Sequence, residues 1–433
     1  MEAFLTAKAE KQGGFIMREM RNIIVGQSGG PTSAINSSLA GVYVAARERG
    51  FHKVYGMLHG IQGLLDEKYV DLSTQIHSEL DIELLKRTPS AFLGSCRYKL
   101  PEIHEDMEIY ERIFEILDRL EIEVFIYIGG NDSMDTIKKL SDFAIVKGHT
   151  QKFLGVPKTI DNDLALTDHT PGFGSAAKYI GASTKEVIRD ALGLTYKKEM
   201  ITIIEVMGRN AGWLTGATAL AKTEECEGPD LIYLPELPFD IDKFLEKVKE
   251  LLKVKKSIVV AVSEGIKLAD GRYVCELGSV GDYVDAFGHK QLQGTAAYLA
   301  GFLSSEIGCK TRSVEFSTLQ RSASHMASRV DIDEAFMVGG AAVKAADEGD
   351  TGKMVVIDRV SDDPYMSATG IYDVHRIAND EKFVPRNWVN EEGTYVTKDF
   401  VDYVKPLIQG DYQPIMVNGL PRHLVLNNQG LSD

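Results

Sequence analysis

The sequence predicts an α/β fold of largely parallel strands flanked by helices. Short apolar runs that end in glycines or polar loops recur along the chain, as in "NIIVGQSGG" at 22–30 and "EVFIYIGG" at 123–130. Stretches with helical spacing separate these runs, and in "DMEIYERIFEILDRL" at 106–120 the apolar positions fall on one face. Strands that alternate with helices form parallel βαβ units. A length of 433 residues indicates two or three domains.

The predicted elements follow one another in a regular order. Helical spacing begins at Ile35, after the first strand, and ends at Gly50. A strand and a turn are expected within 53–65, before the helix at 106–120 and the strand that follows it. Further buried strands are predicted at 153–156, 199–206, 256–263 and 353–360. No low-complexity linker marks a domain border, so we expect the chain to cross between domains near residues 170, 320 and 385.

Composition and charge exclude several classes of protein. The chain has 63 acidic and 48 basic residues, a net charge of −15, which argues against a general nucleic-acid binder. Its four cysteines form no CxxC pair, so neither a disulfide framework nor a zinc site is expected, and a cytoplasmic location follows. No run approaches the length of a membrane span. Residues 1–20 lack an apolar signal core and are interpreted as an N-terminal extension.

Unusual loops follow five of the predicted strands. They are "GQSGGPTSAIN", "GGNDS", "PKTIDND", "VMGRNAG" and "SEG". Ligands of parallel sheets bind at the carboxyl ends of the strands. We therefore expect the five loops to meet at one site.

Two of these loops have the composition of phosphate-binding turns. Residues 28–36 and 129–136 each place glycine amides at the start of a helix, where the helix dipole favours an anion. Glycine also occurs at such turns only because the backbone needs a positive φ. Ser28 completes a G-x-S-x-G pattern, which leaves a serine hydrolase as an alternative without a matched Asp and His. The "GFGSAA" stretch at 172–177 is expected to be a loop running into a helix.

The loop "PKTIDND" carries the strongest local signal. Asp161 and Asp163 follow a buried strand, so one could accept a proton while the other holds Mg²⁺. Solvated loop acids are the simpler explanation for two aspartates alone. Lys158 beside them and Asp132 on a parallel loop favour phosphoryl transfer, which needs a metal ion, positive charge and a base.

Together, "GGNDS", "PKTIDND", "MGR", "SEG" and "LQR" resemble the phosphofructokinase family, in its order from about residue 21 to 385. The resemblance implies two α/β domains with the active site in the cleft between them. The expected division is 21–170 with 320–385 for the donor and Mg²⁺, and 171–319 with 386–433 for the sugar phosphate. The implied reaction moves a phosphoryl group to the 1-hydroxyl of fructose 6-phosphate in a homodimer or homotetramer.

The resemblance also implies roles for individual residues. Asp161 would be the base, and Asp163 and Asn131 would position Mg²⁺. The acceptor would be bound by Thr159, Ile160, Asp161, Met207, Gly208, Arg209, Glu264, Arg312, Gln320 and Arg321. Of these, Arg312 would reach the site of a neighbouring subunit. The donor would be bound by Gly30, Arg97, Gly130, Asp132, Ser133 and Lys158, and the catalytic group would comprise Asp161, Lys158, Asp132 and Arg209.

Two positions indicate pyrophosphate as the donor. Members of the family that use ATP usually have Gly where this chain has Asp132 and Lys158, and members that use pyrophosphate have Asp and Lys. A carboxylate placed about 4 Å from the α-phosphate of ATP would cost roughly 4 kcal/mol at an effective dielectric constant near 20. Pyrophosphate ends before that point, and Lys158 supplies positive charge to the transferring phosphate.

Several departures from the family pattern remain. Asn131 stands where many members have an Asp that helps to hold Mg²⁺. Thr318 replaces a frequent His, and Met200 replaces a frequent Arg, for which Lys197 or Lys198 could substitute. ATP-dependent phosphofructokinase stays open as an alternative, as does a regulatory subunit without activity, although the intact Asp161 argues against the latter.

Overall fold

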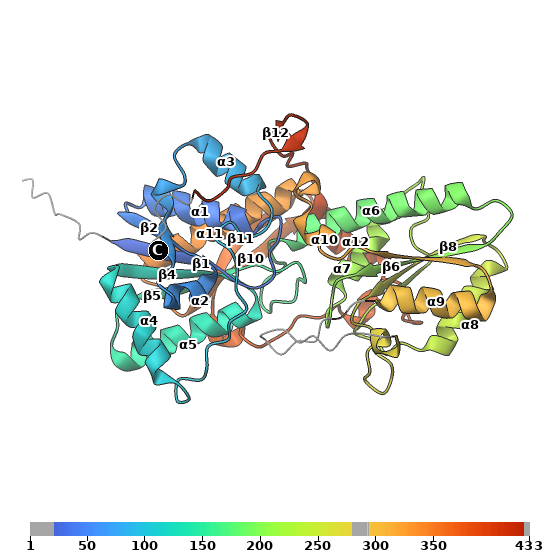
Figure 1. The fold of residues 1–433 in the computed structure, drawn as a ribbon, viewed down its shortest axis with the longest axis horizontal. Coiled ribbons are helices and arrows are strands. Elements are labelled where there is room, and N and C mark those ends of the chain that lie inside the picture. Colours follow the sequence, from blue (N-terminus) through green and yellow to red (C-terminus); the bar gives the residue numbers. More distant parts are fainter. Residues whose placement is uncertain (1–20, 279–291, 293, 428–433) are drawn as a thin grey trace, which may run out of the picture.

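The computed structural model describes residues 21–278, 292 and 294–427, which form two units, each built on one sheet (Figure 1). The extension predicted at 1–20 lies outside the described residues. The first unit contains a seven-stranded sheet of order β11-β10-β5-β4-β1-β2-β3, and the second a four-stranded sheet of order β7-β8-β6-β9. Every strand predicted from the sequence is present, as the bounds below show.

The first sheet is parallel except at its two edges. Its strands are β1 (Asn22–Gln27), β2 (Lys53–Met57), β3 (Tyr69–Asp71), β4 (Ile122–Gly129), β5 (Lys152–Pro157), β10 (Lys353–Asp362) and β11 (Tyr365–Asp373). Only β3 and β11 run antiparallel to their neighbours. In β1, Ile23 and Val25 belong to one core cluster while Ile24 belongs to the other, because successive side chains of a strand point to opposite faces.

Helices cover both faces of this sheet (Figure 1). One core contains side chains from α1 (Ile35–Glu48), α3 (Glu79–Arg87) and α11 (Arg329–Asp347). The other contains side chains from α2 (Gly60–Leu65), α4 (Met107–Arg119) and α5 (Asn131–Lys147). The helices predicted from Ile35 and at 106–120 thus form within two residues of their expected bounds.

The second sheet is parallel throughout and is also covered on both faces. Its strands are β6 (Met200–Val206), β7 (Leu231–Tyr233), β8 (Ser257–Ser263) and β9 (Lys310–Glu315). One face packs against α6 (Phe173–Leu194), α7 (Trp213–Gly216) and α12 (Lys398–Val404), and the other against α8 (Ile241–Leu252) and α9 (Thr295–Ile307). Because α6 begins at Phe173, the loop expected to run into a helix at "GFGSAA" is confirmed.

Short elements complete the described chain. They are the helix α10 (Leu319–Ser322), the 3₁₀ turns η1 (Leu72–Thr74), η2 (Ala217–Ala221), η3 (Val274–Leu277), η4 (Ser324–Met326), η5 (Val374–Arg376), η6 (Arg386–Trp388) and η7 (Lys405–Ile408), and the hairpin of β12 (Met416–Val417) and β13 (Leu420–Pro421). None of the helices in the described ranges is both long and apolar enough to cross a membrane.

The end of the described chain returns to the first unit. Leu424 and Leu426 pack against the core beneath α1, and the Leu424 amide donates to Thr88 Oγ1 at 2.9 Å. These contacts favour assigning the last described residues to the first unit, whereas the predicted division had placed all of 386–433 with the second. The borders expected near residues 170, 320 and 385 stay a prediction.

Candidate active site

The carboxyl ends of both sheets open into a pocket of about 470 Å³. In the first sheet Gln27 pairs with Ile128, and Gly129 pairs with Pro157, so the loops that follow three strands start side by side. In the second sheet Val206 pairs with Ser263, which aligns two more loops in the same way. Fifteen predicted residues line the pocket: Gly30, Arg97, Gly130, Asn131, Asp132, Ser133, Lys158, Thr159, Ile160, Asp161, Asp163, Met207, Arg209, Glu264 and Arg321.

The loop after β1 brings glycine backbone close to two cations. A Cβ on Gly29 would lie 3.1 Å from the Lys158 Nζ, and one on Gly30 would lie 3.2 Å from a guanidinium nitrogen of Arg321. Gly29 also has φ +76°, a conformation that side chains rarely adopt. The Lys158 ammonium donates to the Gly30 carbonyl at 2.8 Å. Because Gly29 and Gly30 have no side chains, a ligand has room to approach the charged groups of Lys158 and Arg321.

The loop after β4 forms the start of α5. A Cβ on Gly129 would lie 1.8 Å from Ser133 Oγ, so only glycine allows the turn to close this tightly. Gly130 caps the helix without a side-chain hydrogen bond. Asp132 lies in the first turn, where the helix dipole stabilises a carboxylate. Asn131 Oδ1 is buried and has no hydrogen-bond partner.

The loop after β5 holds two acids and a base in one enclosed space. Thr159 Oγ1 accepts from the Asp161 amide at 3.0 Å and lies 3.3 Å from Asp161 Oδ2. Burial raises the pKa of Asp161, although the Thr159 hydroxyl and the nearby cations, Lys158 first among them, oppose the shift. Burial, with the Asp161 carboxylate adding to it, raises the pKa of Asp163 to about 7. Burial lowers the pKa of Lys158 to about 8, so it is mostly charged at neutral pH.

The second unit contributes an acid and a cation from its aligned loops. Burial, then the Asp161 carboxylate, raises the pKa of Glu264 to about 8, so its side chain is largely protonated at neutral pH. Glu264 Oε1 accepts weakly from the Gly208 amide, at 3.4 Å. Arg209 follows β6 and lines the same pocket. Burial and the neighbouring Arg97 lower the pKa of Arg321, and the Asp161 and Glu264 carboxylates oppose that shift.

Three predicted residues do not line the pocket. Gly208 has φ +141°, and a Cβ there would lie 2.6 Å from the Ala211 carbonyl oxygen, so it shapes the turn that presents Arg209. Gln320 is buried, and its Oε1 accepts from the Met207 amide at 3.3 Å. In the described chain Gln320 supports the Met207 loop, and its contact with substrate stays a prediction.

Arg312 lies on β9, away from this pocket. It forms an ion pair with Asp190 at 3.1 Å on an exposed surface. Its role in the site of a neighbouring subunit stays a prediction. Lys197 and Lys198, considered as substitutes for the Arg that Met200 replaces, do not line the pocket either.

Sequence reasoning missed some residues of the pocket lining. Five of them belong to loops that the sequence analysis had already assigned to the site, so their position in those loops could have identified them: Ser28, Gly29, Pro31, Asn210 and Ala211. Asn379 and Glu381 come from the segment after β11, for which the sequence carries no motif. No histidine lines the pocket within the described residues, so Ser28 lacks the base that a serine hydrolase requires.

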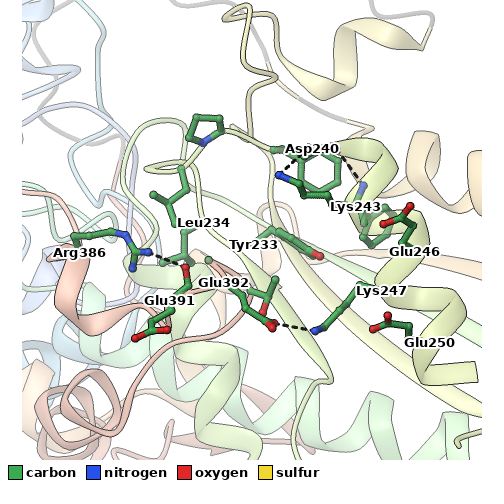
Figure 2. A pocket seen from close by; sticks show the side chains of 16 residues that line it. Tyr233, Leu234, Asp240, Lys243, Glu246, Lys247, Glu250, Arg386, Glu391 and Glu392 are labelled. Carbon is green, nitrogen blue, oxygen red and sulfur yellow. Dashed lines mark hydrogen bonds and ion pairs between the residues drawn. The ribbon is translucent and has the colours of Figure 1, made fainter.

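A second cavity, of about 620 Å³, lies on the second unit beside α8. Its charged groups pair mainly with one another, as in the Lys247–Glu392 ion pair and the Lys243–Asp240 contacts (Figure 2). The Arg386 guanidinium donates to backbone carbonyls of 389–391. None of the predicted loops reaches this cavity, so the smaller pocket is the candidate active site.

The pocket offers few protein side chains for a metal ion, so the phosphates of a bound substrate would supply most of its ligands. Within the described ranges, no group of three or more His, Cys, Asp or Glu side chains is placed to hold a metal. Asn131 Oδ1 is a buried oxygen without a partner, and Asp163 is a carboxylate whose charge is disfavoured by its neighbours. Asn131 and Asp163 would help to hold a divalent cation, because amide and carboxylate oxygens are ligands that such ions prefer.

Comparison with known proteins identifies the family. The family model described as phosphofructokinase matches residues 22–346. The chain belongs to the phosphofructokinase family. Enzymes of this family generally use a divalent metal ion.

Similar proteins of this family cover nearly the whole chain. A pyrophosphate–fructose 6-phosphate 1-phosphotransferase from Halomonas elongata is 41% identical over 403 residues, which cover 93% of this chain and 95% of that protein. The enzyme of the same name from Xanthomonas campestris is 41% identical over 409 residues, 94% of this chain and 96% of its own. The crystal structure of a pyrophosphate-dependent phosphofructokinase from Nitrosospira multiformis has a TM-score of 0.86 at 37% identity and covers 95% of this chain and 98% of its own.

Proposed function

We propose that this phosphofructokinase transfers a phosphoryl group from pyrophosphate to the 1-hydroxyl of fructose 6-phosphate, giving fructose 1,6-bisphosphate and phosphate, reversibly. The observation that carries the proposal is the donor end of the pocket. Lys158 reaches the glycine loop after β1 there, and Asp132 occupies the first turn of α5. The relatives that bear this activity in their names support it.

Asp161 is the base in this proposal. Its pKa is raised and so lies closer to the operating pH than that of an exposed Asp. This suits a group that must take a proton from a hydroxyl and release it again. Glu264, largely protonated at neutral pH, can donate a hydrogen bond to a sugar oxygen. Arg209 and Arg321 supply the charge that binds the sugar phosphate.

Lys158 and Asp132 have different roles at the donor end. Lys158 sits between the glycine loop and the acids, where its charge stabilises the transferring phosphoryl group and replaces contacts that a nucleotide would otherwise make. Asp132 repels a third phosphate. Gly30, Gly130, Ser133 and Arg97 contact the remaining oxygens of the donor.

Mg²⁺ is the proposed cofactor, held by Asn131 and Asp163 together with the donor phosphates. When bound, it neutralises charge on the donor and helps to orient it. We further propose a cytoplasmic homodimer or homotetramer, in which Arg312 completes a neighbouring site. The exposed position of Arg312 on the edge strand β9 supports that part.

Initial rates with fructose 6-phosphate and Mg²⁺, measured with pyrophosphate and separately with ATP, test the proposal. We expect turnover with pyrophosphate and a value of kcat/KM for ATP lower by on the order of a thousandfold, as the charge clash implies. Equal use of both donors would favour the ATP-dependent alternative. No turnover with either donor would favour a regulatory subunit.

A further inference from the structure

The segment after β11 brings a lysine to the back of the loop that carries the two acids. The Lys382 amide donates to the Asp163 carbonyl at 2.8 Å. Its ammonium donates to the Asp168 carbonyl at 2.7 Å and to the Thr167 carbonyl at 3.2 Å. Lys382 therefore holds both ends of the stretch 163–168 without lining the pocket itself.

Asn162 is the point where this support meets the acids. It lies between Asp161 and Asp163, is completely buried, and has φ +56°. Its Oδ1 accepts from the Thr170 amide at 3.1 Å and from the Lys382 ammonium at 3.4 Å. The two acids on either side of Asn162 both line the pocket, and the hydrogen bonds of its side chain help to hold this left-handed backbone conformation in place.

Tyr403 of α12 anchors the same loop from a second direction. Its hydroxyl accepts from Asn162 Nδ2 at 3.0 Å and donates to the Asp168 carbonyl at 2.6 Å. Lys382 and Tyr403 thus share two partners, the Asn162 side chain and the Asp168 carbonyl.

Trp213 connects these anchors to the acceptor side of the pocket. Its indole N–H donates to the Lys382 carbonyl at 3.0 Å, and its ring lies 5.2 Å from the Lys382 ammonium and 5.3 Å from the Tyr403 ring. Trp213 begins α7, directly after the loop that carries Arg209. The cluster therefore fixes the acid loop of the first unit relative to the arginine loop of the second.

We propose that Lys382 and Tyr403 are positioning residues that hold the Asp161 carboxylate in line with the acceptor hydroxyl. This inference rests on the proposed function, in which Asp161 is the base. Displacing a base by about 1 Å can lower a rate on the order of a hundredfold. Binding of the sugar phosphate depends on side chains from other loops and should change little.

The test uses two variants with matched controls. Lys382→Met removes the ammonium but keeps the stem, and Tyr403→Phe removes only the hydroxyl. Lys139→Met is the control for the first, because the Lys139 ammonium also bonds a carbonyl, that of Leu100 at 2.9 Å, and forms ion pairs with Asp135 and Glu102. Tyr110→Phe is the control for the second, because its hydroxyl donates to the Pro101 carbonyl at 2.6 Å in the core of the first unit.

We expect kcat per folded enzyme to fall roughly 100-fold in Lys382→Met and roughly 10-fold in Tyr403→Phe, with KM for fructose 6-phosphate within about threefold of wild type. Both controls should keep kcat within about twofold. A fall in kcat shared by the controls, or a change carried by KM, would overturn the inference. If Lys382→Met does not fold, Tyr403→Phe decides, and an unchanged kcat in that variant overturns it.

The double variant sharpens the result. Because both side chains hold the same two points of one loop, the combined loss in kcat should be smaller than the product of the single losses. Independent, multiplying losses would contradict a shared positioning role. If the wild-type enzyme and Lys382→Met turn over pyrophosphate equally well, this inference is refuted and the proposed function is not. If the wild-type enzyme is inactive, the proposed function itself is refuted.

Discussion

The donor and acceptor halves of the pocket are built differently. The donor half, after β1, β4 and β5, depends on glycines that leave space for backbone and cations to approach a ligand, as at Gly29 and Gly129. The acceptor half, after β6 and β8, depends on half-buried side chains such as Glu264 and on buried supports such as Gln320. In the proposed function, donor recognition therefore depends on local turns of the first unit, whereas acceptor recognition also needs residues of the second unit.

Asp161 serves both halves, so its loss should have the largest effect. Asp161→Ser should lower kcat by about a thousandfold or more, because general base catalysis and an electrostatic contact are lost together. Fructose 6-phosphate should still bind, since Arg209 and Arg321 remain. Steady-state kinetics and calorimetric titration would separate the two, and near-normal turnover would refute the role as base.

Changing the donor half alone should alter donor choice. Asp132→Gly with Lys158→Gly should lower kcat/KM for pyrophosphate on the order of a hundredfold and admit ATP, because the clash with the α-phosphate is removed. The affinity for fructose 6-phosphate should hold within a few fold. Donor-dependent initial rates measure the change; undetectable binding of ATP would contradict the clash argument.

Changing the acceptor half alone should affect the sugar and the pH dependence. Burial, followed by the Asp161 carboxylate, raises the pKa of Glu264 from its ordinary value of 4.5 to about 8. The folded protein therefore binds this proton more tightly than the unfolded chain and loses stability as pH rises from about 4.5 through 8. Glu264→Gln mimics the protonated form and should raise the free energy of unfolding at pH 9 by on the order of 1 kcal/mol relative to wild type.

The same variant should raise KM for fructose 6-phosphate no more than about tenfold at pH 7, because an amide can still donate a hydrogen bond. Urea unfolding at pH 6 and pH 9 and kinetics at pH 7 measure the two effects. Equal stability gains at both pH values would show that burial of the charge is not the cause.

The smallest effect is expected for a single methyl group in the donor half. Gly29→Ala places a Cβ 3.1 Å from the Lys158 ammonium and strains a φ of +76°. KM for pyrophosphate should rise a few fold and the free energy of unfolding should fall by about 1 kcal/mol. Thermal unfolding and donor kinetics check both values. Gly271→Ala is a matched control, with φ +90° but no atom within 4 Å of the added Cβ.

The sequence predicted the parts of the site that depend on strand order. Parallel strands with aligned registers bring their following loops together, so Lys158 and Asp132 could be placed in one site from their positions after two strands. The family assignment is confirmed by the match over residues 22–346. The fold class is confirmed as well, because periodic apolar runs specify strands and helices locally.

The rest depended on contacts between distant segments. Glu381 and Lys382 reach the site from a segment without periodicity, and nothing in "NDEKF" indicates that its lysine will bond carbonyls more than two hundred residues away, at Thr167 and Asp168. Gln320 was assigned to substrate because it stands in the motif "LQR", and the structure shows that its side chain also accepts a hydrogen bond from the Met207 amide. A motif places a residue near a site but does not decide which way its side chain points.

The repeated passage of the chain between the two units has a consequence for folding. After β5 in the first unit, helix α6 packs in the second unit, and α11 packs in the first again. Helix α12 then packs against the second unit, and Leu424 packs against the first. Neither unit is a continuous stretch of sequence, so neither could be expressed by cutting the gene at one place. Because the chain passes between the units several times, a single proteolytic nick should leave both pieces associated.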